Sequence, residues 1–119
     1  MKILLDECVP WPMRKMLVDH ECTNPYKCGW SGVTNGELLK LAKNEFELFI
    51  TSDQNLRYQQ NLTGRRIAIL ELSTNDLRRI LASESLIVEA VTSIKGGEYL
   101  QLEIPCRRSP KMHHLMVTC

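Results

Sequence analysis

The sequence predicts a three-layer α/β domain built on a mainly parallel sheet. Two short apolar runs, residues 3–5 and 48–50, show no polar alternation, which is typical of strands that are covered on both faces. Each run ends close to an acid, Asp6 or Asp53. Segments with helical spacing separate the apolar runs, and this alternation favours parallel strand pairing. The carboxyl ends of such strands share one edge, where open α/β sheets bind ligands.

Five strands are expected along the chain. The first comprises the opening run up to Asp6, and a short second strand is predicted at residues 20–23. The loop that follows carries Tyr26 and Trp30, either as stacking surfaces for a base or as aromatics packed beneath the loop. The remaining strands are predicted at residues 46–51, 67–72 and 99–104.

Three helices are expected between these strands. The first opens at Pro10, because proline is tolerated in a first helical turn. The second is predicted to start with a capping box in which Thr34 and Glu37 exchange hydrogen bonds. The third is a long helix from about residue 77 to 94, with Ser73, Thr74 and Asn75 as candidate N-caps.

Composition limits the classes of function. The chain has 119 residues and a formal net charge of +1, so we expect one domain at residues 1–104, a loosely held basic tail at 105–119 and no broad basic footprint. No apolar run approaches the roughly 20 residues that cross a bilayer, and the N-terminus lacks a signal-peptide pattern, so a cytoplasmic location is expected. The five cysteines include no CxxC pair, which indicates free thiols and no structural zinc.

The acids at the strand ends suggest a metal site. If the first and third strands are neighbours, Asp6 and Asp53 lie at one edge, and the start of the predicted Thr34 helix brings Asn35 and Glu37 towards it. Grouped carboxylates repel one another unless a cation is present, and oxygen ligands suit Mg²⁺ or Mn²⁺. Such an ion activates water and polarises phosphate oxygens. The alternative is that these acids only cap turns and the helix.

Three segments carry a family resemblance: MKILLDECVP, NGELLKLA and FITSDQNLRYQQNL. Their order and separation resemble the short PIN-like domains of the Mut7-C type that are often found in bacterial toxin–antitoxin gene pairs. The resemblance implies a Mg²⁺- or Mn²⁺-dependent ribonuclease in which Asp6, Asp53 and Glu37 are catalytic, and these three with Asn35 bind the metal. It also implies single-stranded RNA as substrate, and a small antitoxin protein or a second copy of the chain as partner.

The chain departs from the PIN-like pattern at two positions. Asn35 and Asn55 stand where acids are often found, so a non-catalytic PIN-like interaction protein is an alternative function. Arg57, Arg65 and Arg66 are candidates for phosphate binding, or solvated surface charges. A receiver-type phosphoacceptor domain also places acids after its first and third strands, but it needs a lysine beyond the last strand, where this chain has Pro105 and Cys106.

Overall fold

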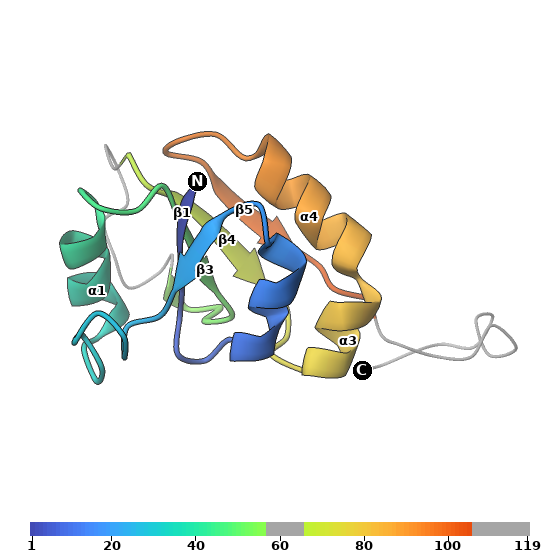
Figure 1. Cartoon of the computed structure of the whole chain (residues 1–119), viewed down its shortest axis with the longest axis horizontal. Helices are drawn as coiled ribbons and strands as arrows, with labels where there is room; N and C mark the ends of the chain where they lie inside the picture. The colour runs from blue at the N-terminus through green and yellow to red at the C-terminus, as the bar shows by residue number, and fades with distance from the viewer. Residues whose placement is uncertain (57–65, 106–119) are drawn as a thin grey trace, which may run out of the picture.

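The computed structural model describes residues 1–56 and 66–105 of the chain. Within these ranges five parallel strands form one sheet in the order β2-β1-β3-β4-β5 (Figure 1). The strands are β1 (Lys2–Leu5), β2 (Glu21–Thr23), β3 (Leu48–Thr51), β4 (Ala68–Leu72) and β5 (Tyr99–Leu102). The predicted α/β fold with a parallel sheet is therefore confirmed, with strand ends within two residues of those expected from the sequence.

Helices cover both faces of the sheet (Figure 1). One face carries the 3₁₀ helix η1 (Trp11–Leu17) and the helices α3 (Leu77–Ala82) and α4 (Glu84–Ser93), and α1 (Asn35–Ala42) lies on the other. Successive strand side chains point to opposite faces, so Ile3 and Leu5 of β1 pack under the first layer whereas Leu4 packs under α1. This double covering explains why the strands read as continuous apolar runs.

The predicted long helix is wrong, because the chain forms two helices that meet at Ser83. The backbone of Ser83 leaves the helical region, with φ −109° and ψ 24°, so α3 ends and α4 starts there. The N-cap of α3 is also not one of the three predicted residues. Asp76 caps the helix by accepting a hydrogen bond from the Arg78 amide at 3.0 Å. The Thr74 hydroxyl instead accepts from the Asp76 amide and fixes the turn before the cap.

The chain order creates a switch point in the sheet. From β1 the next strand, β2, lies on one side, and β3 lies on the other side of β1. The strands end at the lower edge in Figure 1, and α1 begins at that same edge. Ligands of open α/β sheets bind outside the strand ends at such a point. No helix in the described ranges has the length and apolar character needed to span a membrane.

Candidate functional site at the strand ends

Asp6 is a buried carboxylate at the switch point. Its amide donates to the Ile50 carbonyl at 2.9 Å, which carries the pairing of β1 with β3 one residue beyond the strand. The side chain is 7% exposed, and donors surround both oxygens. Oδ1 accepts from the Glu7 amide at 2.8 Å, and Oδ2 accepts from the Thr51 hydroxyl at 2.7 Å and from the Cys8 thiol at 3.2 Å. Local donors thus hold this carboxylate in one orientation.

Asp53 lies two residues beyond β3 and reaches the same hydroxyl. Its amide donates to Thr51 Oγ1 at 3.0 Å, and its Oδ1 accepts from the Asn55 amide at 3.0 Å. The Thr51 hydroxyl therefore touches the carboxylate of Asp6 and the backbone of Asp53 together. The structure places both acids at the carboxyl ends of neighbouring parallel strands, as the sequence predicts. Their roles as metal ligands and catalytic groups stay predictions.

Cys8 completes this cluster as a protonated thiol. Its sulfur lies 3.1 Å from the Ser52 hydroxyl and 3.7 Å from the Thr51 hydroxyl. Burial raises the pKa of Cys8 above its usual 9.0, and the charge of Asp6 also raises it, while hydrogen bonds from Ser52 work in the opposite direction. A raised pKa keeps the thiol protonated at neutral pH. Cys8 can therefore donate to Asp6, which a thiolate could not do.

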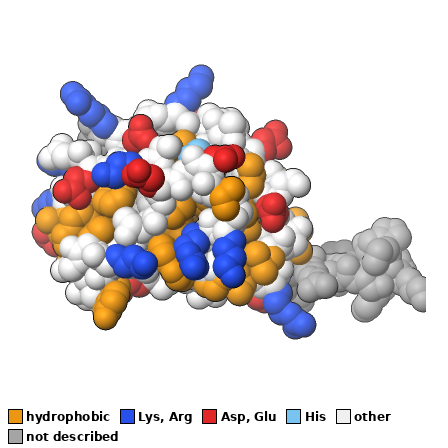
Figure 2. All heavy atoms as spheres, in the orientation of Figure 1, with side chains coloured by type: hydrophobic (Ala, Val, Ile, Leu, Met, Phe, Trp, Pro, Cys, Tyr) orange, Lys and Arg blue, Asp and Glu red, His pale blue; other side chains and the backbone are white. Residues whose placement is uncertain are grey.

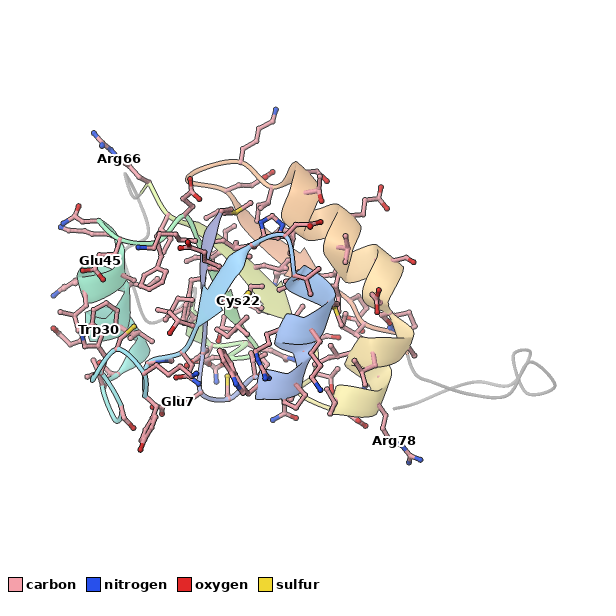
Figure 3. All side chains as sticks on the ribbon, in the orientation of Figure 1. Glu7, Cys22, Trp30, Glu45, Arg66 and Arg78 are labelled. Carbon is pink, nitrogen blue, oxygen red and sulfur yellow. The ribbon has the colours of Figure 1, made fainter. Side chains whose placement is uncertain are left out.

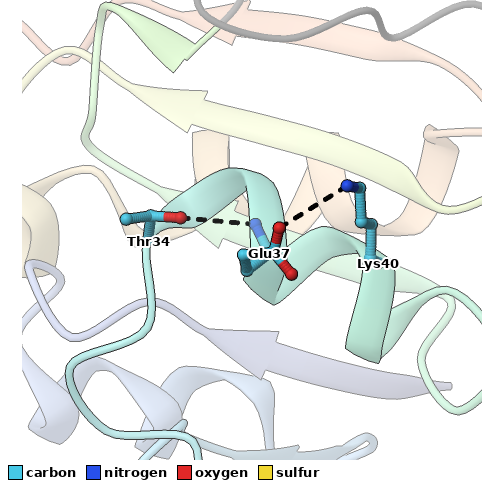
Figure 4. Close-up of polar contacts among 3 residues, drawn as sticks. All are labelled: Thr34, Glu37 and Lys40. Atoms are coloured by element: carbon cyan, nitrogen blue, oxygen red, sulfur yellow. Dashed lines mark hydrogen bonds and ion pairs between the residues drawn. The ribbon is translucent and has the colours of Figure 1, made fainter.

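Glu37 behaves as a helix-start residue that faces solvent. Figure 4 shows its amide donating to the Thr34 hydroxyl at 3.5 Å, so the predicted N-cap at Thr34 is confirmed. Its carboxylate pairs with Lys40 at 3.5 Å, and its side chain is 64% exposed. In a full capping box the Glu37 carboxylate would accept a hydrogen bond from the Thr34 amide. Here it pairs instead with Lys40, one turn further along the helix. Asn35 begins α1, and its side chain lies outside what the structure describes.

The acids do not form a preassembled ligand set. Across residues 1–56 and 66–105, no three His, Cys, Asp or Glu side chains are grouped so that they could hold one metal ion. Glu37, which was predicted to bind the metal with Asp6, Asp53 and Asn35, is paired through Oε1 with Lys40. The ligand set therefore stays a prediction.

Arg66, the one described residue of the three arginines predicted to hold phosphate, does not lie at this edge. Arg66 precedes β4, so it lies at the opposite end of the sheet from Asp6, beside a hollow that includes Met1 and Glu47. In Figure 3, Arg66 is at the upper left and Glu7 is at the lower edge. The residue before a parallel strand lies opposite the strand ends, so Arg66 is separated from the acidic edge, and its role in phosphate binding stays a prediction. Arg57 and Arg65 lie outside the described residues.

A polar row crosses the sheet beside Asp6, and most of it was not expected. Thr51 of β3 pairs in register with Glu71 of β4, and Glu71 pairs with Gln101 of β5. Glu71 is 4% exposed and accepts from the Tyr99 hydroxyl at 2.6 Å and the Gln101 amide at 3.2 Å. One sequence pattern could have identified Glu71 as buried. Side chains alternate along residues 68–72, so Glu71 lies on the same covered face as Ile69.

Comparisons with protein-family models, with curated proteins and with solved structures found no match to this chain. The structure shows a parallel α/β fold that is compatible with PIN-like and with other Rossmann-like domains. After β5 the chain continues with Glu103, Ile104 and Pro105, so the lysine that a receiver-type domain needs is absent from these positions. Cys8, Cys22 and Cys28 are free thiols, as predicted, and Cys106 and Cys119 lie outside the described residues.

Proposed function

We propose that the chain is a divalent-metal-dependent nuclease of the PIN-like type that cleaves single-stranded RNA. One observation supports this proposal above the others: the Thr51 hydroxyl ties the buried carboxylate of Asp6 to the segment that carries Asp53, at the switch point of the sheet. The resemblance of the chain to toxin–antitoxin PIN-like domains supplies the substrate class and the expectation of a small antitoxin partner.

The donors at this edge fit Mg²⁺ or Mn²⁺. A carboxylate has about four lone-pair positions, and the amide, the hydroxyl and the thiol around Asp6 occupy three of them. One position on Asp6 Oδ1 is therefore left for an ion. Mg²⁺ typically keeps several waters and binds one or two carboxylates together with substrate phosphates, so Asp6 and Asp53 suffice as protein ligands. The ion would activate a water and stabilise charge on the phosphodiester.

Paired substitutions test the proposal. In Asp53→Asn and Asp6→Asn one carboxylate charge is lost at nearly constant volume, so both variants should lose Mn²⁺ binding and Mn²⁺-dependent cleavage of single-stranded RNA. Asp19→Asn is the matched control, because Asp19 is exposed and precedes β2, at the opposite end of the sheet. Calorimetric Mn²⁺ titration and gel-resolved cleavage are the measurements. Cleavage that persists in both aspartate variants would overturn the proposal.

A second candidate function is a PIN-like protein that binds a partner without catalysis. The exposed pair of Glu37 with Lys40 favours it, because the charge of that carboxylate is already matched by a lysine on the helix surface. The amides at Asn35 and Asn55 also lower the charge available to a metal. A homogeneous preparation that neither binds Mn²⁺ nor cleaves RNA would support this function instead of the nuclease. Glu37→Gln separates the two roles of Glu37, because only a metal ligand would change Mn²⁺ affinity.

A further inference from the structure

A pocket of about 440 Å³ opens beside Asp6, outside the ends of β1 and β2. Apart from Asp6 and Glu7, its lining comes from the segment that leads into η1 and from the loop before α1. These lining residues are Val9, Pro10, Trp11, Asn24, Tyr26 and Ser31. The pocket thus joins the proposed cleavage site to two aromatic side chains, Trp11 and Tyr26. The chemistry of its lining therefore indicates which ligand the site binds.

Two cations contact the ring of Trp11, which lines this pocket, although neither cation is itself a lining residue. The guanidinium of Arg14 lies 4.7 Å from the centre of the Trp11 ring, and the ammonium of Lys27 lies 5.2 Å from it. Arg14 also donates to the Trp11 carbonyl at 3.2 Å. Cation–π contacts of this kind hold a charge in place without neutralising it. Figure 2 shows Lys and Arg side chains in a row across this part of the surface, over η1 and the loop before α1.

The second aromatic of the pocket is presented to solvent. Tyr26 is 76% exposed, whereas the other aromatic of the same loop, Trp30, packs edge-on against Phe46 at 6.1 Å. The sequence left both aromatics open to either fate, and the structure assigns packing to Trp30 and exposure to Tyr26. The turn around Tyr26 is fixed, because the Asn24 side chain accepts from the Lys27 amide at 2.8 Å. An exposed ring on a fixed turn is preorganised for stacking.

A second pocket lies at this edge of the sheet. It is about 200 Å³, lies outside β4 and β5, and is lined by Glu71 and Glu103 together with Gln54, Ser73, Gln101 and Leu102. Among the described residues it is lined, like the pocket beside Asp6, by two carboxylates and by no cation, but no aromatic side chain lines it. The cations that contact the Trp11 ring and the exposed ring of Tyr26 therefore favour the pocket beside Asp6 for an anionic chain that carries bases.

We propose that the pocket beside Asp6 binds one nucleotide of a single-stranded nucleic acid, with its base stacked on Tyr26 and its phosphates held by Arg14 and Lys27. The inference rests on the proposed function, because it places the phosphodiester next to the carboxylate of Asp6. It goes further in naming the residues that bind the substrate. Aromatic stacking accepts any base, and two cations supply a modest attraction that depends on salt.

Binding is measured without metal, so that it is separate from cleavage. The full chain is titrated into a fluorescent single-stranded RNA oligonucleotide in EDTA, and anisotropy gives the dissociation constant. Tyr26→Ala should weaken binding about fivefold or more, the loss expected for one stacked base. Tyr26→Phe is the matched control and should bind like the wild type, because the ring remains. Tyr26 is exposed, so circular dichroism should show an unchanged fold in both variants.

Salt dependence tests the phosphate contacts. Arg14→Gln and Lys27→Gln should each reduce the slope of log K against log salt by about 0.7, the value for one phosphate contact on a single strand. Lys40→Gln is the control, since Lys40 lies on α1 and pairs with Glu37. Wild-type protein that does not bind RNA in EDTA, or Tyr26→Ala protein that binds as tightly as the wild type, would overturn the subsite.

The two proposals fail in different ways. Tyr26-dependent binding without any Mn²⁺-dependent cleavage would support the subsite and overturn the nuclease. Mn²⁺-dependent cleavage, together with an RNA affinity that is unchanged in Tyr26→Ala, would overturn the subsite and support the nuclease.

Discussion

Two buried carboxylates, Asp6 and Glu71, flank Thr51 on the same face of the sheet and are satisfied in different ways. Asp6 is 7% exposed and is held by the next amide, a hydroxyl and a thiol. Glu71 is 4% exposed and is held by a phenol and an amide from β5. In the described part of the chain, neither carboxylate pairs with a cation. Neutral donors on neighbouring strands are therefore enough to bury both carboxylates here.

The difference lies in what each carboxylate faces. Asp6 lines a pocket of about 440 Å³ together with Glu7 and two aromatic rings, whereas Glu71 lines one of about 200 Å³ together with Glu103 and, among the described residues, no aromatic ring. The donors of Asp6 are the next backbone amide and two short side chains, whereas those of Glu71 are long side chains that tie β4 to β5. Burial alone therefore does not identify a site, and the neighbouring charges and rings do.

The largest loss of stability is expected from Thr51→Val. This variant removes one hydrogen-bond donor from Asp6 and leaves both donors of Glu71 in place. The substitution keeps the shape of the side chain but loses a hydrogen bond to a buried charge and the acceptor for the Asp53 amide. We expect a loss of about 3 kcal/mol in the free energy of unfolding, measured in urea. Thr92→Val is the matched control and should change stability by less than about 0.5 kcal/mol, because Thr92 is exposed on α4. Equal effects at the two positions would contradict the role given to Thr51.

A smaller effect is expected from Tyr99→Phe, the equivalent change at Glu71. The variant loses the 2.6 Å hydrogen bond to Glu71, while Gln101 still serves the other oxygen. The expected loss is about 1.5 kcal/mol in the same urea experiment. Tyr26→Phe should be neutral, since that ring is exposed. If Tyr99→Phe destabilises the fold more than Thr51→Val does, the hydrogen bond to Glu71 contributes more to stability than the one to Asp6.

The smallest effect is on the titration of Cys8. Because burial and then Asp6 raise its pKa, Cys8 should be alkylated by iodoacetamide with a midpoint above pH 9.0. Asp6→Asn should move that midpoint to lower pH, because the negative charge that opposes ionisation is gone. Cys22 is the internal control, since its pKa is raised mainly by burial, with no contribution from Asp6, and should not respond. Mass spectrometry of alkylated peptides across a pH series gives both midpoints.

The raised pKa of Cys8 also determines how the stability of the fold changes with pH. A thiol whose folded pKa is raised stabilises the fold below the unfolded pKa, and this contribution is lost as the pH rises through the folded value. Stability should therefore fall above pH 9.0, and Cys8→Ser should make the fall less steep. A steeper fall in Cys8→Ser would contradict this assignment.

The sequence predicted the parts of the fold that depend on short-range patterns. Apolar runs located β1, β3 and β4, the positions of β2 and β5 were also predicted, and Thr34 marked the start of α1. The break at Ser83 was missed because the apolar stripe continues through it, and packing rather than pattern decides whether one helix or two forms. At the site, Asp6 and Asp53 were found because acids after apolar runs are conspicuous.

The remainder of the site needed the register of the sheet. Glu71 sits inside an apolar run, and only its pairing with Thr51 shows that it belongs to the same polar row as Asp6. The cations on Trp11 come from two segments, η1 and the loop before α1, that no local pattern connects. Long-range contacts of this kind depend on the three-dimensional path of the loop, which residue types do not specify.

The unequal layers on the two faces have a consequence for motion. Among the described residues, the helix on this face is α1, whose eight residues are fewer than an isolated helix needs to be stable in water, so it depends on Leu38, Leu39 and Ala42 packing against the sheet. The opposite layer has three helical segments. Amide hydrogens of α1 should accordingly open to exchange by local fluctuation before those beneath α4. The face of the sheet that is covered by α1, the helix that follows the Tyr26 loop in the chain, is thus expected to open locally while the sheet stays intact.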